Sequence, residues 1–343
     1  IQKRANEKAS KSADVAVGGL SRLQAKLVAF GGAAQTFETG MRVAGAAMRA
    51  LSQPIDLATT FEREFNLVRT LSDDVTTSTR QNLLDLASQV PQTQIEIARS
   101  AFNALSRGVS EADLVSFLRT ASQAATAGNT DLVTASDSLL KSLGAFGKKG
   151  ETVASIGSKI FTTVKLAATN FDQLNASLGQ GLAVCSYGVK LEELLAIAGT
   201  LTKTLGLNFS EAIVRTNALM NVVTGATKKN QDALKKIGVE YGVAAIRAKG
   251  LAAVLADLRE KTQGSAAALS NLSGNQRARQ GLLGILEGTN YQELTGFLEE
   301  VRTETDGLGK AQRKVAGDAQ AARDQFKSLS ESVLRDLGEA VLP

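Results

Sequence analysis

The residues that most often carry enzymatic chemistry are scarce in this sequence. It contains no His, so the commonest metal ligand and the usual general base near neutral pH are both missing. The one cysteine, Cys185, cannot form an internal disulfide, and its apolar surroundings favour a buried thiol over a reactive nucleophile. Catalytic triads, Cys–His pairs and the usual zinc sites are therefore excluded. We expect no catalytic residue, no cofactor and no bound metal.

Pairs of adjacent acidic residues are the next candidates for general acid and base. They occur at Asp73–Asp74, Glu192–Glu193 and Glu299–Glu300. Neighbouring side chains on a helix point about 100° apart, so the two carboxylates of one pair do not converge on a substrate. We therefore predict that the two Glu pairs are ordinary exposed charges.

The segment 143–152, LGAFGKKGET, has the composition of a phosphate-binding loop. Its Lys148 is followed by Lys149 instead of Ser or Thr, and no strand is predicted before it. The segment is therefore interpreted as a solvated turn between two helices.

The positive charge of the chain is concentrated in an N-terminal arm. Residues 1–50 contain eight Lys or Arg and three acidic residues, a net charge of +5 that equals the net charge of the whole chain. Double-stranded DNA carries one negative charge per ~1.7 Å, so salt-dependent contact without sequence selectivity is one interpretation. Because no aromatic platform or recognition helix is visible, the alternative is a solvated coiled-coil exterior. The candidate DNA contacts are Lys3, Arg4, Lys8 and Lys11.

The same arm carries apolar residues at alternating steps of four and three from Ala9 to Leu51, the spacing of a left-handed coiled coil. We expect it to associate with copies of itself, and the alternative is an amphipathic helix lying on its own body. Paired glycines at 18–19 and 31–32 weaken the helix and favour a kink. The principal seam positions are Leu20, Leu23, Leu27, Phe30, Phe37, Met41, Met48 and Leu51.

Hydrophobic periodicity predicts an all-α fold. Aromatic residues make up only 4% of the chain, and small residues take their place, which favours slim, closely packed helices. Two stretches share one design of Gly–Val, an acidic helix start, an apolar stripe, a Gly turn and a second helix. They predict stacked helical hairpins, with turns at Gly108, Gly128, Gly188 and Gly206.

Pro54 ends the arm, because the residue before a proline leaves helical geometry. We predict an elongated multi-helix bundle with three parts: a basic heptad helix at 1–54, a helical core at 55–275 and C-terminal helices at 276–343. Within the core, one long helix is expected from Val243 to Lys261. A second, coiled-coil-like seam, expected to pack on the body or on copies of itself, comprises Leu308, Ala311, Val315, Ala319, Ala322, Phe326, Leu329, Val333, Leu337 and Ala340.

Three segments together resemble the core domain of phage tail tape measure proteins: GVKLEELLAIAGTLTKTLGLNFSEA (188–212), residues 108–147, and SLSESVLRDLGEAVLP (328–343). The resemblance covers roughly Phe61 to Pro343. It implies a virion structural protein, not an enzyme, that is made in the host cytoplasm and lies in the tail, in the tube lumen or at the tip. It further implies a helical rod that sets tail length, supports tail assembly and is released during genome ejection. The implied partners are the tail tube, the tail-tip or baseplate hub proteins, and further copies of the chain in a trimer or hexamer.

The chain starts with Ile and lacks a signal-peptide pattern, so we interpret it as an excerpt of a longer protein. No membrane segment is predicted within it, since no run of eighteen apolar residues occurs. In the family it resembles, an ending of this type is where a long hydrophobic region commonly begins, and that region is absent here. The alternative function is a helical-bundle interaction or toxin-like module of a secretion or injection system.

Overall fold

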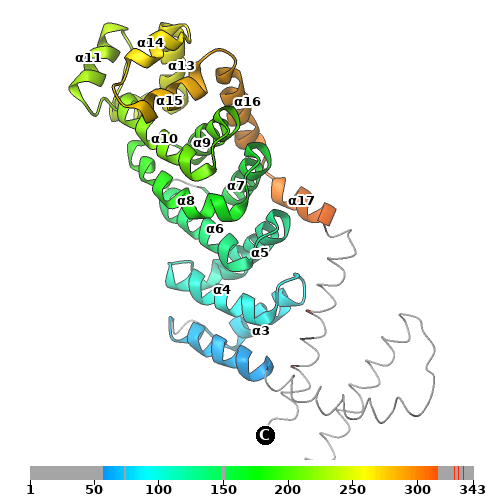
Figure 1. Cartoon of the computed structure of the whole chain (residues 1–343). Helices are drawn as coiled ribbons and strands as arrows, with labels where there is room; N and C mark the ends of the chain where they lie inside the picture. The colour runs from blue at the N-terminus through cyan, green and yellow to red at the C-terminus, as the bar shows by residue number, and fades with distance from the viewer. Residues whose placement is uncertain are drawn as a thin grey trace, which may run out of the picture. The chain divides into compact units, whose positions relative to one another are not determined.

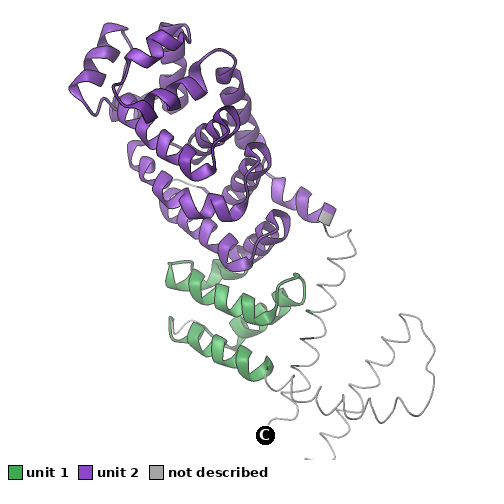
Figure 2. Cartoon of the chain, viewed as in Figure 1, with its two compact units in different colours: residues 1–115, 319–343 green, residues 116–318 purple. Residues whose placement is uncertain are grey.

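Helices make up all of the regular structure in the computed structural model, which describes residues 57–72, 75–147 and 151–315 together with Ser328, Glu331 and Arg335. No strand occurs among these residues, so the predicted all-α class is confirmed (Figure 1). The chain divides into two compact units (Figure 2). Unit 1 is residues 1–115 and 319–343, and unit 2 is residues 116–318. The predicted boundaries after residues 54 and 275 stay predictions.

The described part of unit 1 is built on a helix at 57–69, α3 (Thr77–Ala87) and α4 (Gln94–Ser106). Phe61 and Phe65 are buried on the first helix and their rings stack with centroids 6.1 Å apart. The helix α4 begins at a capping box formed by Thr93 and Glu96. There the Thr93 backbone N–H donates to Glu96 Oε2 at 2.8 Å and the Glu96 N–H donates to Thr93 Oγ1 at 3.3 Å.

Two residues of the C-terminal segment complete the core of unit 1. The Ser328 hydroxyl donates to the carbonyl of Ala87, and the Arg335 guanidinium donates to Gln94 Oε1 at 3.3 Å. Arg335 also lies over the Phe61 ring, 6.0 Å from its centroid. At these two positions the C-terminal segment packs on the body. The seam residues from Ala319 onward lie outside the described residues.

Unit 2 contains both predicted hairpins. The first consists of α5 (Glu111–Gly128), which begins in unit 1, and α6 (Leu132–Phe146). The helices α7 (Val153–Ala167) and α8 (Phe171–Gly181) and the 3₁₀ helix η2 (Leu182–Tyr187) follow. The second hairpin is α9 (Leu191–Leu205) with α10 (Phe209–Val223).

The remainder of unit 2 is a series of shorter helices. They are α11 (Lys228–Lys236), α12 (Val243–Lys249), α13 (Leu251–Thr262), α14 (Ala266–Asn271), α15 (Gln276–Leu286), α16 (Asn290–Thr303) and α17 (Gly307–Val315). The prediction of one helix from Val243 to Lys261 is wrong. Gly250, with φ of +86°, lies outside helical geometry and separates α12 from α13.

The core of unit 2 is centred on α9. Every residue from Leu191 to Thr202 is buried, because α7, α10, α15 and α16 pack around this helix (Figure 1). The helix α16 approaches α9 closely at Gly199, where an added Cβ would overlap with the ring of Phe297. A glycine is therefore needed here for packing.

Three of the four predicted glycine turns have a left-handed backbone: φ is +90° at Gly108, +98° at Gly188 and +64° at Gly206. The prediction for Gly128 is wrong. This residue ends α5 against the ring of Phe171, and the left-handed residue is Asn129, with φ of +50°.

Candidate functional site

The residues predicted to act lie outside the described part of the chain. These are the seam positions Leu20, Leu23, Leu27, Phe30, Phe37, Met41, Met48 and Leu51, and the basic residues Lys3, Arg4, Lys8 and Lys11. Their roles in self-association and DNA contact stay predictions. The remaining candidates for chemistry are the titratable groups buried around α9.

A buried charge cluster joins α7 to α9. Lys159, on α7, is 9% exposed and forms ion pairs with two carboxylates, Glu151 just before α7 and Glu192 in the first turn of α9. The Lys159 Nζ lies 2.9 Å from Glu192 Oε2. Glu151 also accepts a hydrogen bond from the Ser155 hydroxyl at 2.7 Å. Each charge in the cluster therefore has an opposite charge as partner.

This pairing fixes the protonation of the cluster. Burial lowers the pKa of Lys159, but its hydrogen bonds to Glu151 and Glu192 outweigh burial and raise the pKa above its ordinary value. Burial likewise raises the pKa of Glu151, and the hydrogen bonds from Lys159 and Ser155 bring the pKa below its ordinary value. The lysine stays charged and Glu151 stays ionised near neutral pH. The shifts of these two groups are opposite to those of a general base or acid tuned to work at that pH.

Glu193, beside Glu192, joins the first turns of two helices. Its Oε2 accepts the backbone N–H of Lys190 at 2.9 Å, at the N-terminus of α9. Its Oε1 accepts the N–H of Ala252 at 2.9 Å, in the first turn of α13. The break at Gly250 exposes this N–H, and a Cβ at Gly250 would lie 3.4 Å from Glu193 Oε1. The carboxylate thus satisfies two N–H groups that helix geometry leaves unpaired.

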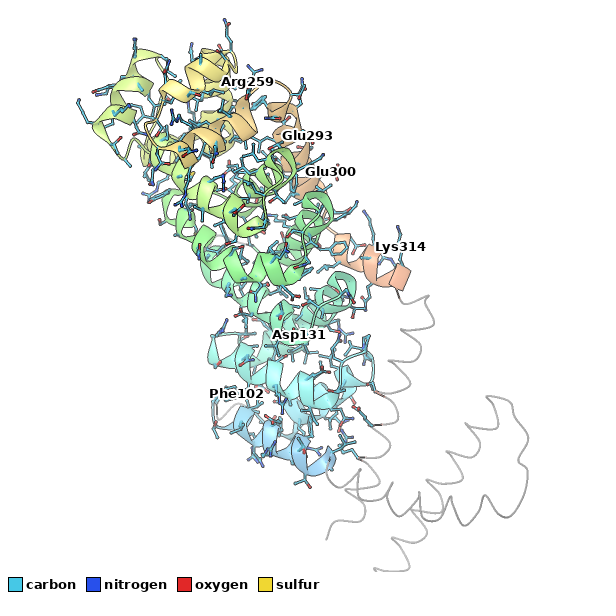
Figure 3. The ribbon with its side chains drawn as sticks, viewed as in Figure 1. Phe102, Asp131, Arg259, Glu293, Glu300 and Lys314 are labelled. Atoms are coloured by element: carbon cyan, nitrogen blue, oxygen red, sulfur yellow. The ribbon has the colours of Figure 1, made fainter. Side chains whose placement is uncertain are left out.

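The prediction that Glu192 and Glu193 are exposed charges is wrong, because they are only 8% and 6% exposed. Two signals in the sequence indicate that these two carboxylates are not free surface charges. Glu193 stands three residues after the residue that precedes the helix, which is the capping-box spacing. The next six residues of α9, from Leu194 to Gly199, are all apolar or small and cover every side of the helix, which is typical of a buried helix. Glu299 and Glu300 on α16 are exposed as predicted, and Figure 3 labels Glu300. Asp73 and Asp74 lie outside the described residues.

Two further predictions concern Cys185 and the turn after α6. Cys185, in η2, is partly exposed instead of buried, and its thiol donates to the carbonyl of Ala145 at 2.9 Å. In the turn, Thr152 caps α7 by accepting the N–H of Ser155 at 3.2 Å. The threonine thus serves as a helix cap. Lys148 and Lys149 lie outside the described residues.

Within the described ranges, no group of three or more Cys, Asp or Glu side chains is arranged to hold a metal ion. No helix in that part of the chain is both long and apolar enough to span a bilayer. The buried charges connect α7, α9 and α13, and this geometry supports the assembly of the helices.

The comparisons with known proteins agree with a structural role. The family model of the phage-related minor tail proteins matches residues 80–274, which is more than half of the 343 residues. The matched range includes both hairpins and the charge cluster. The comparison with curated proteins and the comparison with solved structures gave no match. An all-helical body with this match over most of its described length identifies the chain as a member of the phage-related minor tail protein family.

Proposed function

We propose that this chain is part of a tape measure protein, a rod in the tail tube that sets tail length, supports tail assembly and leaves the tube during genome ejection. Membership of the minor tail protein family gives the coarser role, a structural component of the phage tail that interacts with other tail components. The observation that carries the finer role is the heptad seam from Ala9 to Leu51, which directly precedes the helical body.

A heptad rod is physically suited to measuring length. A helix advances ~1.5 Å per residue, so the number of residues between two fixed points converts directly into distance. The seam needs partner helices to cover it, and copies of the chain in a trimer or hexamer would do so while tube subunits assemble around them. The body contributes a folded helical end that contacts tail-tip or hub proteins. Its role is non-enzymatic.

The test is a set of in-frame deletions in the phage gene that encodes the parent protein. Deleting residues 16–36 removes three heptads and keeps the seam in register. The tails of the resulting virions should be shorter by about 30 Å, as measured by electron microscopy. A control replaces the same residues with an unrelated heptad sequence of equal length, and tail length should not change.

Intact infectious tails of unchanged length in the deletion strain would contradict the ruler and favour an interaction module instead. Short tails in both strains would point to an assembly defect that is independent of rod length, and this would also contradict the proposal.

Self-association is tested separately on the whole chain. Its mass in solution should be a multiple of 35.9 kDa, and replacing Leu23, Leu27 and Phe37 with Asn should reduce the mass to that of one chain. The matched control is Leu67→Asn, a change at a 47% exposed leucine outside the seam, which should leave the mass unchanged. A wild-type chain of 35.9 kDa at high micromolar concentration would contradict the oligomer.

A further inference from the structure

The charges of the body are separated along the chain, although they nearly cancel overall. Residues 203–286 contain twelve Lys or Arg and five Asp or Glu, a net charge of +7. Residues 51–202 and 287–343 together carry −7. The basic region begins at the end of α9 and runs through α15. Residues 51–343 are therefore neutral as a whole but contain a basic portion, which lies within unit 2.

The most basic element of this portion is α11, at one end of unit 2 (Figure 1). Its four lysines are spaced by one and seven residues, so they lie within about 120° of one another around the helix. Asn230 and Leu234 lie on the opposite side and are 5% and 0% exposed. We call the outer side the lysine face, and it consists of Lys228, Lys229, Lys235 and Lys236, all exposed.

The lysine face is only partly neutralised by acidic residues. Asp232 lies among the lysines and pairs with Lys228, with Nζ and Oδ1 3.1 Å apart. Among the residues that the structure describes, Lys229, Lys235 and Lys236 form no ion pair. Lys229 Nζ lies beside Gly274, where an added Cβ would be 3.2 Å from it, and exposed Arg277 follows in α15. About three positive charges on α11 thus remain available to an external partner.

Helix stability accounts for only two of these lysines. Lys235 and Lys236 occupy the last turn of α11, where the helix dipole favours cations. Lys228 and Lys229 occupy the first turn, where the dipole disfavours them and no acidic residue lies; Asp232, in the next turn, offsets only Lys228. Their position indicates a role other than stabilising α11.

We propose that the lysine face binds the phosphate backbone of double-stranded DNA without sequence selectivity. Lysine ammonium groups attract phosphates as point charges and give no base readout. An acidic protein partner fits less well, since protein interfaces have an apolar core from which lysine is depleted. The exposed large hydrophobic residues of the described chain are Leu67, Leu71, Val133 and Leu205, and none of them lies on α11 to α15. The inference goes beyond the proposed function, which does not require it.

The test uses the full chain with all eight basic residues of the N-terminal arm changed to Gln, so that the arm cannot account for binding; they are Lys3, Arg4, Lys8, Lys11, Arg22, Lys26, Arg42 and Arg49. Binding to two fluorescent duplexes of unrelated sequence is followed by anisotropy from 50 to 200 mM salt. Contact with three phosphates predicts a slope of log affinity against log salt of about −3, a loss of about 40-fold over this range. Changing Lys228, Lys229, Lys235 and Lys236 to Gln as well should abolish the binding. Glutamine preserves helix propensity, and circular dichroism checks the fold.

A gain-of-affinity variant keeps the test independent of folding losses. Asp232→Asn removes the one negative charge within the lysine face, so it should bind both duplexes several-fold more tightly and steepen the slope by about one. The proposal is overturned if the arm-neutralised chain shows no salt-dependent binding, or if the α11 variant binds as well as its parent. It is also overturned if polyglutamate of equal total charge competes as well as DNA. None of these outcomes changes the tail-length test, so the two proposals can fail separately.

Discussion

The two helical hairpins of this chain share one sequence design but differ in burial. In the second hairpin, α9 is buried on all sides from Leu191 to Thr202. In the first, α5 keeps Asp113 and Arg119 exposed and α6 keeps Val133 45% exposed. The shared sequence pattern therefore predicts a helical hairpin, but it does not predict how deeply the hairpin is buried.

The difference comes from helices much later in the chain. The helices α15 and α16 begin at Gln276 and Asn290, more than seventy residues after α9 begins, and both pack on it. The first-turn carboxylates Glu192 and Glu193 of this central helix are also buried, and they need partners once water is excluded. Lys159 and the N–H of Ala252 supply them. A helix that becomes central thus needs polar partners that a half-exposed helix does not.

The largest expected effect comes from breaking the buried charge cluster. Replacing Lys159 with Met leaves Glu151 and Glu192 without their shared cation, and removing one partner of a buried ion pair typically costs about 3–5 kcal/mol. The free energy of unfolding, measured by urea denaturation, should fall by that amount.

The matched control is Lys203→Met, at the other end of α9. Lys203 pairs with Glu293 at 2.6 Å, but the two side chains are 54% and 47% exposed, so the loss should be below about 1 kcal/mol. If both lysine variants lowered the free energy of unfolding by the same amount, burial would not determine how much these ion pairs contribute to stability.

Glycine-to-alanine substitutions should have opposite signs in the two hairpins. Gly144, in α6, has open space around an added Cβ, so alanine should stabilise the fold by about 0.5–1 kcal/mol through helix propensity. Gly199, in α9, lies against the Phe297 ring, so alanine should destabilise it by about 1–3 kcal/mol.

Thermal unfolding of the two single variants measures this contrast directly. The double variant Gly199→Ala with Phe297→Leu should recover part of the loss, because the smaller side chain makes room for the added methyl group. A stabilising Gly199→Ala would show that α16 does not pack on α9 as closely as described.

Local signals in the sequence mark the ends of several helices. Thr93, Asn208 and Thr227 begin α4, α10 and α11 as capping residues, and Gly206 ends α9 in the left-handed region. These features depend on residues within one turn of the helix end, so spacing alone reveals them.

Features that depend on distant partners were not predictable in this way. The break at Gly250 is stabilised by a carboxylate from α9, fifty-seven residues earlier. Gly128 lies against the ring of Phe171, which leaves no room for a larger side chain, and the buried Glu192 is paired with Lys159. Helical periodicity carries no information about which helix will supply such a partner.

The smallest expected effect distinguishes the caps of the two hairpins. Asp131 caps α6 by accepting the N–H of Thr134 at 2.8 Å, and Asn208 caps α10 by accepting the N–H of Glu211 at 2.8 Å. Changing either residue to Ala should lower the free energy of unfolding by about 1 kcal/mol at pH 7. The two losses should be equal within about 0.5 kcal/mol.

Lowering the pH should separate the two caps, because only one of them can be protonated. Burial raises the pKa of Asp131, but hydrogen bonds from Thr134 and neighbouring backbone N–H groups outweigh burial and hold the pKa below its ordinary value of 3.8. A group with a depressed pKa in the folded state stabilises the fold above the unfolded pKa and loses this contribution as pH falls through the folded one. The cost of Asp131→Ala should therefore shrink in urea denaturation below pH 3.8, while the cost of Asn208→Ala stays constant. A constant cost for both would show that the charge on Asp131 adds nothing to its role as a cap.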